Sequence, residues 1–130
     1  MFTDDTKIKT PNGEKIIRHI KLGDEVYRAD NTIGKVIEVK PQAYKPTYAV
    51  VCGGKSALYT TLSQAVMTSD ERFVEVGMLR MGNLLKSVGK ISAIAESGDR
   101  KCYGLVIDGD NTYIANGFIV KGEYLYCVKE

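Results

Sequence analysis

Only a few side chains in this sequence could act as strong nucleophiles, titrate near neutral pH or bind a transition metal. They are one histidine, His19, and three cysteines, Cys52, Cys102 and Cys127. The cysteines form no C-x-x-C pair, and a single histidine cannot complete the usual zinc ligand sets, so we expect no metal and no cofactor. The odd cysteine count favours buried or half-buried thiols in a reducing compartment over a disulfide framework. His19 lies in a strand-like segment, where we expect a solvated residue rather than a catalytic base.

Two Asn-Gly pairs, Asn12-Gly13 and Asn116-Gly117, are the other reactive features of the chain. Asn-Gly is the strongest short-range signal for a hairpin turn. Both pairs therefore predict turns, the second between strands at residues 113–115 and 118–121. Asn-Gly bonds also cyclise and deamidate spontaneously, so backbone cleavage there would be chemical ageing rather than function.

Length and composition describe an ordinary soluble domain. The chain has 130 residues, 44% hydrophobic and 26% charged, with a formal net charge of +2. That length suits one domain, and the scattered Lys and Arg argue against a nucleic-acid binder. No apolar stretch approaches the roughly 18–20 residues of a membrane span. The acidic start at residues 1–5 is unlike a signal peptide, so we expect a cytoplasmic protein.

Short runs of β-branched and aromatic residues recur along the chain, separated by Gly, Pro, Asn and Asp. They predict strands near residues 6–10, 14–20, 25–28, 35–39, 48–52, 72–76, 90–95, 103–107, 112–115, 118–121 and 124–128. Pro41 and Pro46 bracket a predicted loop, and the one helical candidate, residues 78–87, is too short to be stable alone. Many short strands at this spacing indicate an all-β domain of the sandwich or barrel kind.

The sequence also repeats itself. Residues 20–26 match residues 79–85, since both read apolar, basic, apolar, Gly, Asp or Asn, any residue, apolar. Three further pairs of segments match in the same order: 10–12 with 68–70, 34–39 with 89–94, and 48–51 with 103–106. We infer a duplication of about residues 10–60 and 68–115. Two similar units related by a pseudo-twofold would each cover the apolar face of the other.

Several segments, in this order and spacing, resemble the Hint (hedgehog/intein) superfamily, and in particular bacterial intein-like domains. The segments are residues 2–8, 20–26, 61–68, 73–85, 102–107 and 111–120. The resemblance covers residues 1–122 and leaves residues 123–130 as a C-terminal extension. It implies a mostly β horseshoe of many short strands with an internal pseudo-twofold. Because intein-like domains often occur in phage and prophage genes, the resemblance also implies part of a phage or prophage product as the alternative to a cytoplasmic protein.

The resemblance also assigns positions to the splicing reaction, in which an N-terminal Cys or Ser attacks the preceding carbonyl. Met1 stands at that position, and its thioether has no proton to lose. Because Met1 is the first residue given, we also expect no upstream peptide bond to be attacked. Thr61, which orients the bond in the family, is retained. Gln64 replaces the family's histidine, and an amide cannot shuttle protons.

The C-terminal half of the reaction site is changed as well. Gly104 stands where the family carries an Asp, and Lys121-Gly122 align with the final His-Asn, whose Asn cyclises. An alternative route in one subclass starts from an internal Cys supported by a Trp. Cys102 lies two positions before that site, and the chain has no Trp, so we expect this route to be absent.

The remaining aromatic residues support the fold more readily than a binding function. Five tyrosines are expected in the core or at its rim, because no basic stripe accompanies them: Tyr44, Tyr48, Tyr59, Tyr103 and Tyr113. The apolar segment at residues 124–128 is expected to add a last strand to a sheet edge. Its alternative is docking onto a partner or parent chain by strand addition.

Three functions are consistent with these residues. The first is a degenerate, non-splicing intein-like domain that serves as a structural or interaction module, with an unknown protein partner or parent chain. The second is a protein-splicing or autoproteolytic element in inactive form, with Met1 in place of the nucleophile. The third is an unrelated β-domain, such as a small phage or secreted structural protein, whose similarity arose by chance.

Overall fold

The structure is a computed structural model, and it describes residues 1–124. Antiparallel strands and two short 3-10 helices, η1 and η2, make up its regular structure, which confirms the predicted all-β class. The elements are β1 (Phe2–Thr3), β2 (Lys7–Thr10), β3 (Gly13–Ile16), η1 (Ile17–His19), β4 (Glu25–Tyr27), β5 (Ile33–Val39), β6 (Ala43–Cys52), β7 (Ser56–Thr60), β8 (Ala65–Met67), β9 (Phe73–Glu75), η2 (Val76–Met78), β10 (Leu84–Leu85), β11 (Gly89–Tyr103), β12 (Leu105–Ile107), β13 (Thr112–Ala115) and β14 (Phe118–Lys121).

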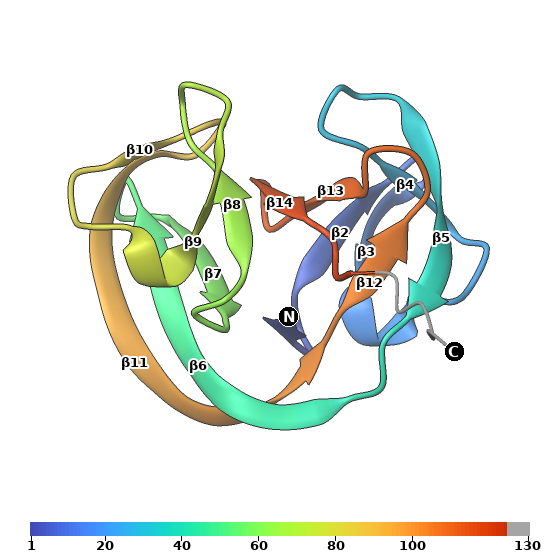
Figure 1. Cartoon of the computed structure of the whole chain (residues 1–130), viewed down its shortest axis with the longest axis horizontal. Helices are drawn as coiled ribbons and strands as arrows, with labels where there is room; N and C mark the ends of the chain where they lie inside the picture. The colour runs from blue at the N-terminus through green and yellow to red at the C-terminus, as the bar shows by residue number, and fades with distance from the viewer. Residues whose placement is uncertain (125–130) are drawn as a thin grey trace, which may run out of the picture.

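Two long strands bend around the base of the molecule and give it the shape of a horseshoe (Figure 1). β6 and β11 pair antiparallel from Ile91 opposite Cys52 to Cys102 opposite Ala43. The register shifts between Ile91 and Ala93 and again between Glu96 and Gly98. Such bulges bend a strand and increase its twist, so the pair curves instead of running flat.

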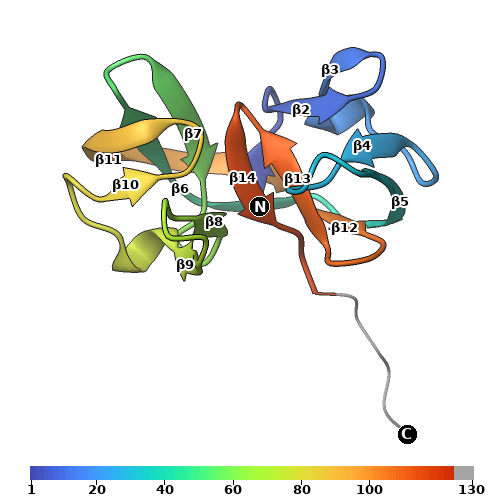
Figure 2. The ribbon, with the colours of Figure 1, turned by 90° about the horizontal axis from the view of Figure 1, so that it is seen from above.

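A six-stranded sheet connects the two arms of the horseshoe. Its order is β3-β2-β13-β14-β8-β9, with the β13–β14 hairpin in the centre. Figures 1 and 2 both show this hairpin between the arms. Asn116 and Gly117 form its turn with φ of 51° and 84°, as the Asn-Gly signal predicted. The Asn116 amide also donates to the Ala57 carbonyl at 2.9 Å and accepts from the Lys7 N–H at 2.8 Å, which fixes the turn against both neighbours.

The core fills the space between the arms. Four of its side chains are at most 1% exposed to solvent: Phe2, Ile8, Tyr113 and Phe118. The rings of Phe2 and Tyr113 meet edge to face at 6.0 Å, a favourable aromatic geometry. Residue 2 is therefore anchored in the core, and the chain just before it is held at a fixed place.

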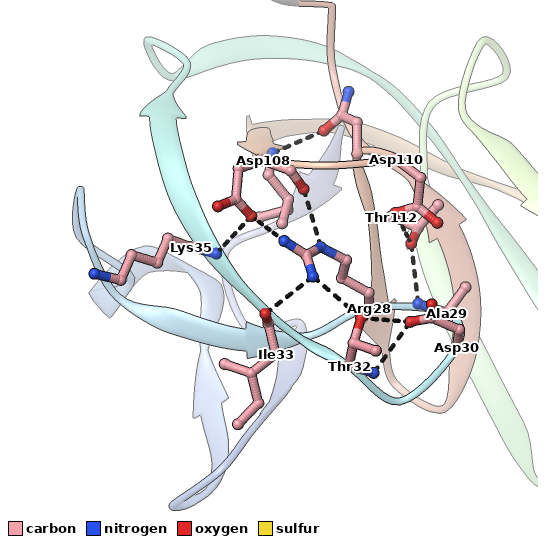
Figure 3. A network of polar contacts seen from close by, with 11 residues as sticks. Arg28, Ala29, Asp30, Thr32, Ile33, Lys35, Asp108, Asp110 and Thr112 are labelled. Carbon is pink, nitrogen blue, oxygen red and sulfur yellow. Dashed lines mark hydrogen bonds and ion pairs between the residues drawn. The ribbon is translucent and has the colours of Figure 1, made fainter.

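Arg28 connects the β4–β5 turn to the loop between β12 and β13 (Figure 3). Its guanidinium donates to the carboxylate and the carbonyl of Asp108, at 2.5 and 3.0 Å, and to the Ile33 carbonyl at 3.0 Å. A Cβ at Gly34 or Gly109 would lie 2.8 or 2.9 Å from the Arg28 Nε, so both glycines leave room for the guanidinium. This contact ties two loops that are far apart in sequence.

Equivalent hydrogen bonds occur in the two halves of the chain. The Ile17 N–H donates to the Thr6 carbonyl at 2.8 Å, and the Val76 N–H donates to the Gln64 carbonyl at 2.8 Å. Each bond opens a 3-10 turn, η1 in the first half of the chain and η2 in the second. The two halves therefore repeat the same local structure.

The same correspondence continues into the bends after the two 3-10 turns. The side chain of Asp24 accepts from the Lys21 N–H at 2.9 Å, and that of Asn83 accepts from the Arg80 N–H at 2.8 Å. Gly23 and Gly82 occupy the left-handed region with φ of 88° and 90°. Asp24 and Asn83, which follow these glycines in the two matched segments, therefore form equivalent bends.

Several predicted boundaries are wrong. Pro46 lies inside β6 rather than at the edge of a loop, and β11 runs to Tyr103, well beyond the predicted end at residue 95. β7 and β8 were not predicted, and residues 78–87 contain no α-helix. His19 is exposed but lies in η1, not in a strand.

Other predictions are confirmed or remain predictions. Cys52 and Cys102 are buried, whereas Cys127 and most of residues 124–128 lie outside the described residues. Tyr103 and Tyr113 are buried, but Tyr44 is 74% exposed. No helix in residues 1–124 is long and apolar enough to cross a membrane. The proposed boundary between residues 1–122 and 123–130 stays a prediction.

The repeat makes a quantitative prediction about two glycines. Gly23→Ala and Gly82→Ala should each cost about 1–2 kcal/mol, because an L-residue is strained at these φ values while the added Cβ meets nothing within 4 Å. Urea unfolding measures both. Gly77→Ala is the matched control, because Gly77 lies in η2 without a positive φ and should cost less. A large difference between Gly23→Ala and Gly82→Ala would contradict the structural equivalence of the two bends.

Candidate functional site

The nitrogen of residue 1 is the centre of the site. It lies between the arms of the horseshoe (Figures 1 and 2). β1 places it there, because Phe2 pairs with Thr60 of β7 on one side and with Tyr103 of β11 on the other. The Met1 nitrogen donates to Gln64 Oε1 at 2.7 Å, Glu123 Oε2 at 3.1 Å and Thr61 Oγ1 at 3.5 Å.

The carbonyl of residue 1 is held as firmly as its nitrogen. It accepts hydrogen bonds from the Thr60 hydroxyl at 2.6 Å and from the Thr61 N–H at 3.2 Å. Thr60 and Thr61 are both buried, at the end of β7. The backbone of residue 1 therefore has one defined orientation at this site.

Gln64 joins the start of the chain to its C-terminal strand. Its side chain is 4% exposed, with Oε1 bound to the Met1 nitrogen. Its Nε2 donates to the Lys121 carbonyl at 2.7 Å and to the Ala65 carbonyl at 3.0 Å. The amide thus uses its oxygen and both its N–H groups, and it neither gains nor loses a proton near neutral pH.

Lys121 contributes its backbone to the site, but its charge points elsewhere. Its Nζ donates to the Asp110 carbonyl at 2.7 Å and lies 5.4 Å from the centre of the Phe73 ring. The residue at 121 was predicted from the sequence as a site position. The structure brings only its carbonyl into contact with Gln64.

Gly122 is packed against Asn111. The Gly122 N–H donates to the Asn111 carbonyl at 2.7 Å. The Asn111 side chain accepts from the Ile107 N–H at 2.7 Å and donates to the Glu123 carbonyl at 2.8 Å. A Cβ at Gly122 would overlap the Asn111 side-chain oxygen and lie 2.9 Å from the Leu105 carbonyl. A larger residue at 122 therefore does not fit this arrangement.

Gly104 is packed against Glu123 in a similar way. A Cβ at Gly104 would overlap the Glu123 Cγ and lie 3.3 Å from the Met1 Cγ. The Glu123 side chain therefore fills the volume that a side chain at 104 would take.

Sequence reasoning missed Glu123 and Asn111. The one available signal for Glu123 was a carboxylate directly after the last matching position, in a chain that lacks one at Gly104.

Cys102 lies beside the site without the features of an activated thiol. It pairs with Thr3 across β1 and β11, and its side chain is buried. Its Sγ donates to the Arg100 carbonyl at 3.4 Å. Burial raises the pKa of this thiol, so it stays protonated at neutral pH.

The electrostatics of the site follow from burial. Desolvation lowers the pKa of the residue 1 amino group below its ordinary value of 8.0, and the nearby Glu123 carboxylate opposes part of that effect. Within residues 1–124, no group of three or more His, Cys, Asp or Glu side chains could hold a metal ion.

Two shallow hollows flank the segment from Thr61 to Gln64. One, of about 230 Å³, is lined by Gln64, Glu75, Glu123 and the backbone around Gly122. The other, of about 330 Å³, is lined by Lys45, Pro46, Tyr48 and residues 61–63.

The predicted site positions are therefore brought together in space, although they span the sequence. Met1, Thr61 and Gln64 are joined by direct hydrogen bonds, and Gly104 and the residues after β14 adjoin them. The arrangement can orient the backbone of residue 1. It presents neither a nucleophile at residue 1 nor a side chain at residue 122.

Solved structures similar to this chain are inteins. A gp41-1 intein with three substitutions is 23% identical, with a TM-score of 0.85, over 93% of this chain and 98% of its own. The N145AA form of the MchDnaB-1 intein is 18% identical, with a TM-score of 0.83, over 95% and 100% of the two chains. A DnaB intein from Synechocystis is 18% identical, with a TM-score of 0.82, over 95% and 98%. The chain therefore has the intein (Hint) fold that its resemblance implied.

No protein-family model matches the sequence, and no curated protein is significantly similar to it. At the identities above, the structural similarity establishes the fold alone.

The contact between Gly122 and Asn111 makes a testable prediction. Gly122→Ala should destabilise the protein by about 1–3 kcal/mol, because the added methyl overlaps a fixed side chain. In an Asn111→Gly background the same change should cost at least about 1 kcal/mol less, as contacting pairs are not additive. A double-mutant cycle in urea gives both values. Additive costs would show that Asn111 does not limit the space at 122.

Burial of the residue 1 amino group makes a pH prediction for the 130-residue chain. Its folded pKa lies below the unfolded value of 8.0, so the unfolded chain binds more protons in the interval between them. The free energy of unfolding should therefore rise as the pH rises through that interval toward 8. Urea midpoints between about pH 6 and 9 measure the slope. An N-terminally acetylated chain is the control, and an identical slope in both chains would contradict the prediction.

Proposed function

We propose that this chain is an intein-like domain that no longer rearranges peptide bonds and serves as a structural or interaction module. The observation that carries the proposal is a well-ordered site without reactive side chains. Residue 1 is oriented by Thr60, Thr61 and Gln64, yet the side chains at positions 1, 64 and 122 have no means to react.

The first missing component is a nucleophile. Attack on the peptide carbonyl before residue 1 requires a side-chain thiol or hydroxyl that can form an acyl intermediate. Met1 supplies a thioether, which has no proton to lose and forms no stable acyl product. Cys102 does not replace it, because its thiol is buried, protonated and bonded to the Arg100 carbonyl.

The second missing component is a proton-transfer group. General acid-base catalysis contributes about 10²–10⁴-fold to such reactions. Gln64 holds the nitrogen of residue 1 at 2.7 Å, which is the right distance, but its amide does not titrate. Gln64 therefore makes the contact that a proton-transfer group would make, but it cannot transfer a proton.

The third missing component is a cyclising amide at the end of β14. Gly122 has no side chain, and Asn111 occupies the adjoining space. The local packing therefore fits glycine at this position, and restoring an Asn there would require Asn111 to move. This supports a domain that is adapted to its substitutions.

The short distance between residue 1 and the end of β14 supports a parent chain as the partner. The Met1 nitrogen donates to the Gln64 side chain, which in turn donates to the Lys121 carbonyl of β14. A domain whose first residue and last described strand lie this close can be inserted into a loop of another protein without separating the flanking segments. We therefore favour a role as an insert or docking module over a freely acting enzyme.

A second candidate function is an autoprocessing element whose residue 1 has replaced the nucleophile. The observation that favours it is the retained pair of hydrogen bonds from Thr60 and Thr61 to the residue 1 carbonyl, which hold the backbone at the reacting position. The packing of Gly122 against Asn111 favours the first candidate, because a substitution at residue 1 alone does not explain it.

Mass spectrometry of the domain between short flanking segments tests the proposal. We expect the chain with its own residues to stay intact during overnight incubation with and without dithiothreitol, because no acyl intermediate forms. A splice or cleavage product at residue 1 or residue 122 would overturn the proposal.

A restored variant provides the matched comparison. Met1→Cys combined with Gln64→His returns a nucleophile and a proton-transfer group to an oriented backbone. We expect thiol-dependent cleavage before residue 1 in this variant, at least about 10²-fold faster than in the original chain. Cleavage of the original chain at a comparable rate would favour the autoprocessing candidate instead.

A further inference from the structure

The two Asn-Gly pairs of this chain lie in turns with different surroundings. Asn12-Gly13 connects β2 to β3 at one edge of the six-stranded sheet, whereas Asn116-Gly117 connects β13 to β14 at its centre. An Asn side chain loses its amide when the backbone nitrogen of the next residue attacks the side-chain carbonyl carbon. Glycine at the next position leaves that nitrogen most accessible, since it carries no side chain. Both pairs therefore have the sequence for this reaction, and their contacts decide which one reacts.

Asn116 is held in place by its side chain. Its Oδ1 accepts from the Lys7 N–H at 2.8 Å, and its Nδ2 donates to the Ala57 carbonyl at 2.9 Å. Its own N–H donates to the Lys7 carbonyl at 2.8 Å. The side chain can turn toward the Gly117 nitrogen only after both of its hydrogen bonds are broken, which requires the hairpin to separate locally from β2 and β7.

The side chain of Asn12 has no such restraint. It makes no hydrogen bond within residues 1–124, and both Asn12 and Gly13 are exposed. Only the backbone is held, because the Asn12 N–H donates to the Thr10 hydroxyl at 3.2 Å and this hydroxyl donates to the Gly13 carbonyl. Gly13 opposes Thr10 at the open end of the β2–β3 pair, where strands separate most easily. A Cβ at Gly13 would meet nothing within 4 Å, so the space beside the attacking nitrogen is open.

The second half of the chain contains a similar turn that already carries a carboxylate. Residues 68–70 match residues 10–12, with Asp70 in the position of Asn12. The Thr68 hydroxyl donates to the Asp70 carboxylate. This bond lowers the pKa of Asp70, so the turn favours the charged side chain. Thr10 supplies the same hydroxyl beside Asn12, and an aspartate at residue 12 therefore fits a turn of this kind.

We propose that Asn12 is a site of spontaneous deamidation in the folded chain, that the fold accommodates the aspartate formed, and that Asn116 is protected. The Gly13 nitrogen forms a bond to the side-chain carbonyl carbon of Asn12, and the amide nitrogen leaves as ammonia with the proton of the Gly13 N–H. Water then opens the cyclic imide, at one carbonyl to aspartate and at the other to isoaspartate. The chain stays connected in both products. The proposal does not depend on the proposed function.

The reaction changes the charge of a defined hollow on the surface. Asn12 lines a hollow of about 550 Å³ together with Lys15 and three carboxylates, those of Glu14, Asp24 and Glu25. Lys15 is already paired with Asp24 at 2.9 Å. Deamidation therefore adds a fourth carboxylate to a hollow whose one lining cation is engaged.

Peptide mapping by mass spectrometry, during incubation of the folded chain in mildly alkaline buffer, measures both rates. We expect Asn12 to react at least about tenfold faster than Asn116, because the two side-chain hydrogen bonds of Asn116 must break first. In guanidinium chloride, which unfolds both turns, the two rates should become similar. Equal rates in the folded chain, or a faster reaction at Asn116, would refute the proposal. A tenfold preference that persists in the denaturant would contradict protection by the fold.

Two matched substitutions test whether the fold accommodates the product. Asn12→Asp should leave the urea midpoint of unfolding equal to that of the original chain within error. Asn116→Asp should lower the midpoint, because a carboxylate cannot donate to the Ala57 carbonyl. A midpoint for Asn12→Asp as low as that for Asn116→Asp, or an Asn12→Asp chain that does not fold, would contradict the proposal. The rate measurement uses the unsubstituted chain and gives its answer whether or not the variants fold.

Discussion

The insertion of β1 between β7 and β11 is the constraint on which the site depends. β1 has two residues, yet Phe2 pairs with Thr60 on one side and Tyr103 on the other, and its ring is buried against Tyr113. Burial of one aromatic side chain fixes the backbone far better than so short a strand could alone. Everything that contacts residue 1 depends on that anchor, because the hydrogen bonds of Thr60, Thr61 and Gln64 require the nitrogen and carbonyl to be in place.

The sequence predicted the features that depend on local chemistry. Asn116-Gly117 specified its hairpin, and the glycines at 23 and 82 marked equivalent bends in the two halves. Features that depend on strand pairing between distant segments were not predicted. The pairing of β6 with β11 extends both strands past Pro46 and Ser97, where no local preference for a strand exists. Pairing with a distant strand decides where each strand begins and ends, so local propensity predicted both strands too short.

In the candidate site, too, positions read from the sequence were predicted, whereas residues brought in by tertiary packing were not. Met1, Thr61, Gln64, Gly104 and Gly122 were found by matching a pattern of positions along the chain. Asn111 and Glu123 were not, because their roles come from the space left by glycines at 122 and 104. A glycine is read from a sequence as a missing side chain, but its neighbours determine what fills the space. In this protein the Asn111 side chain fills the space at 122 and bonds the Ile107 N–H and the Glu123 carbonyl, whereas the Glu123 side chain fills the space at 104 and bonds the Met1 nitrogen.

The central hairpin has a consequence for how the protein unfolds. β13 pairs with β2 at Ala115 opposite Ile8, and β14 pairs with β8 at Val120 opposite Val66. Each pseudo-symmetric half therefore completes its sheet with a strand from the same late segment of the chain. Neither half retains a full set of partners when that segment detaches, so both lose their stability in one cooperative transition, as a two-state unit does. The repeat that looks modular in sequence behaves thermodynamically as a single body.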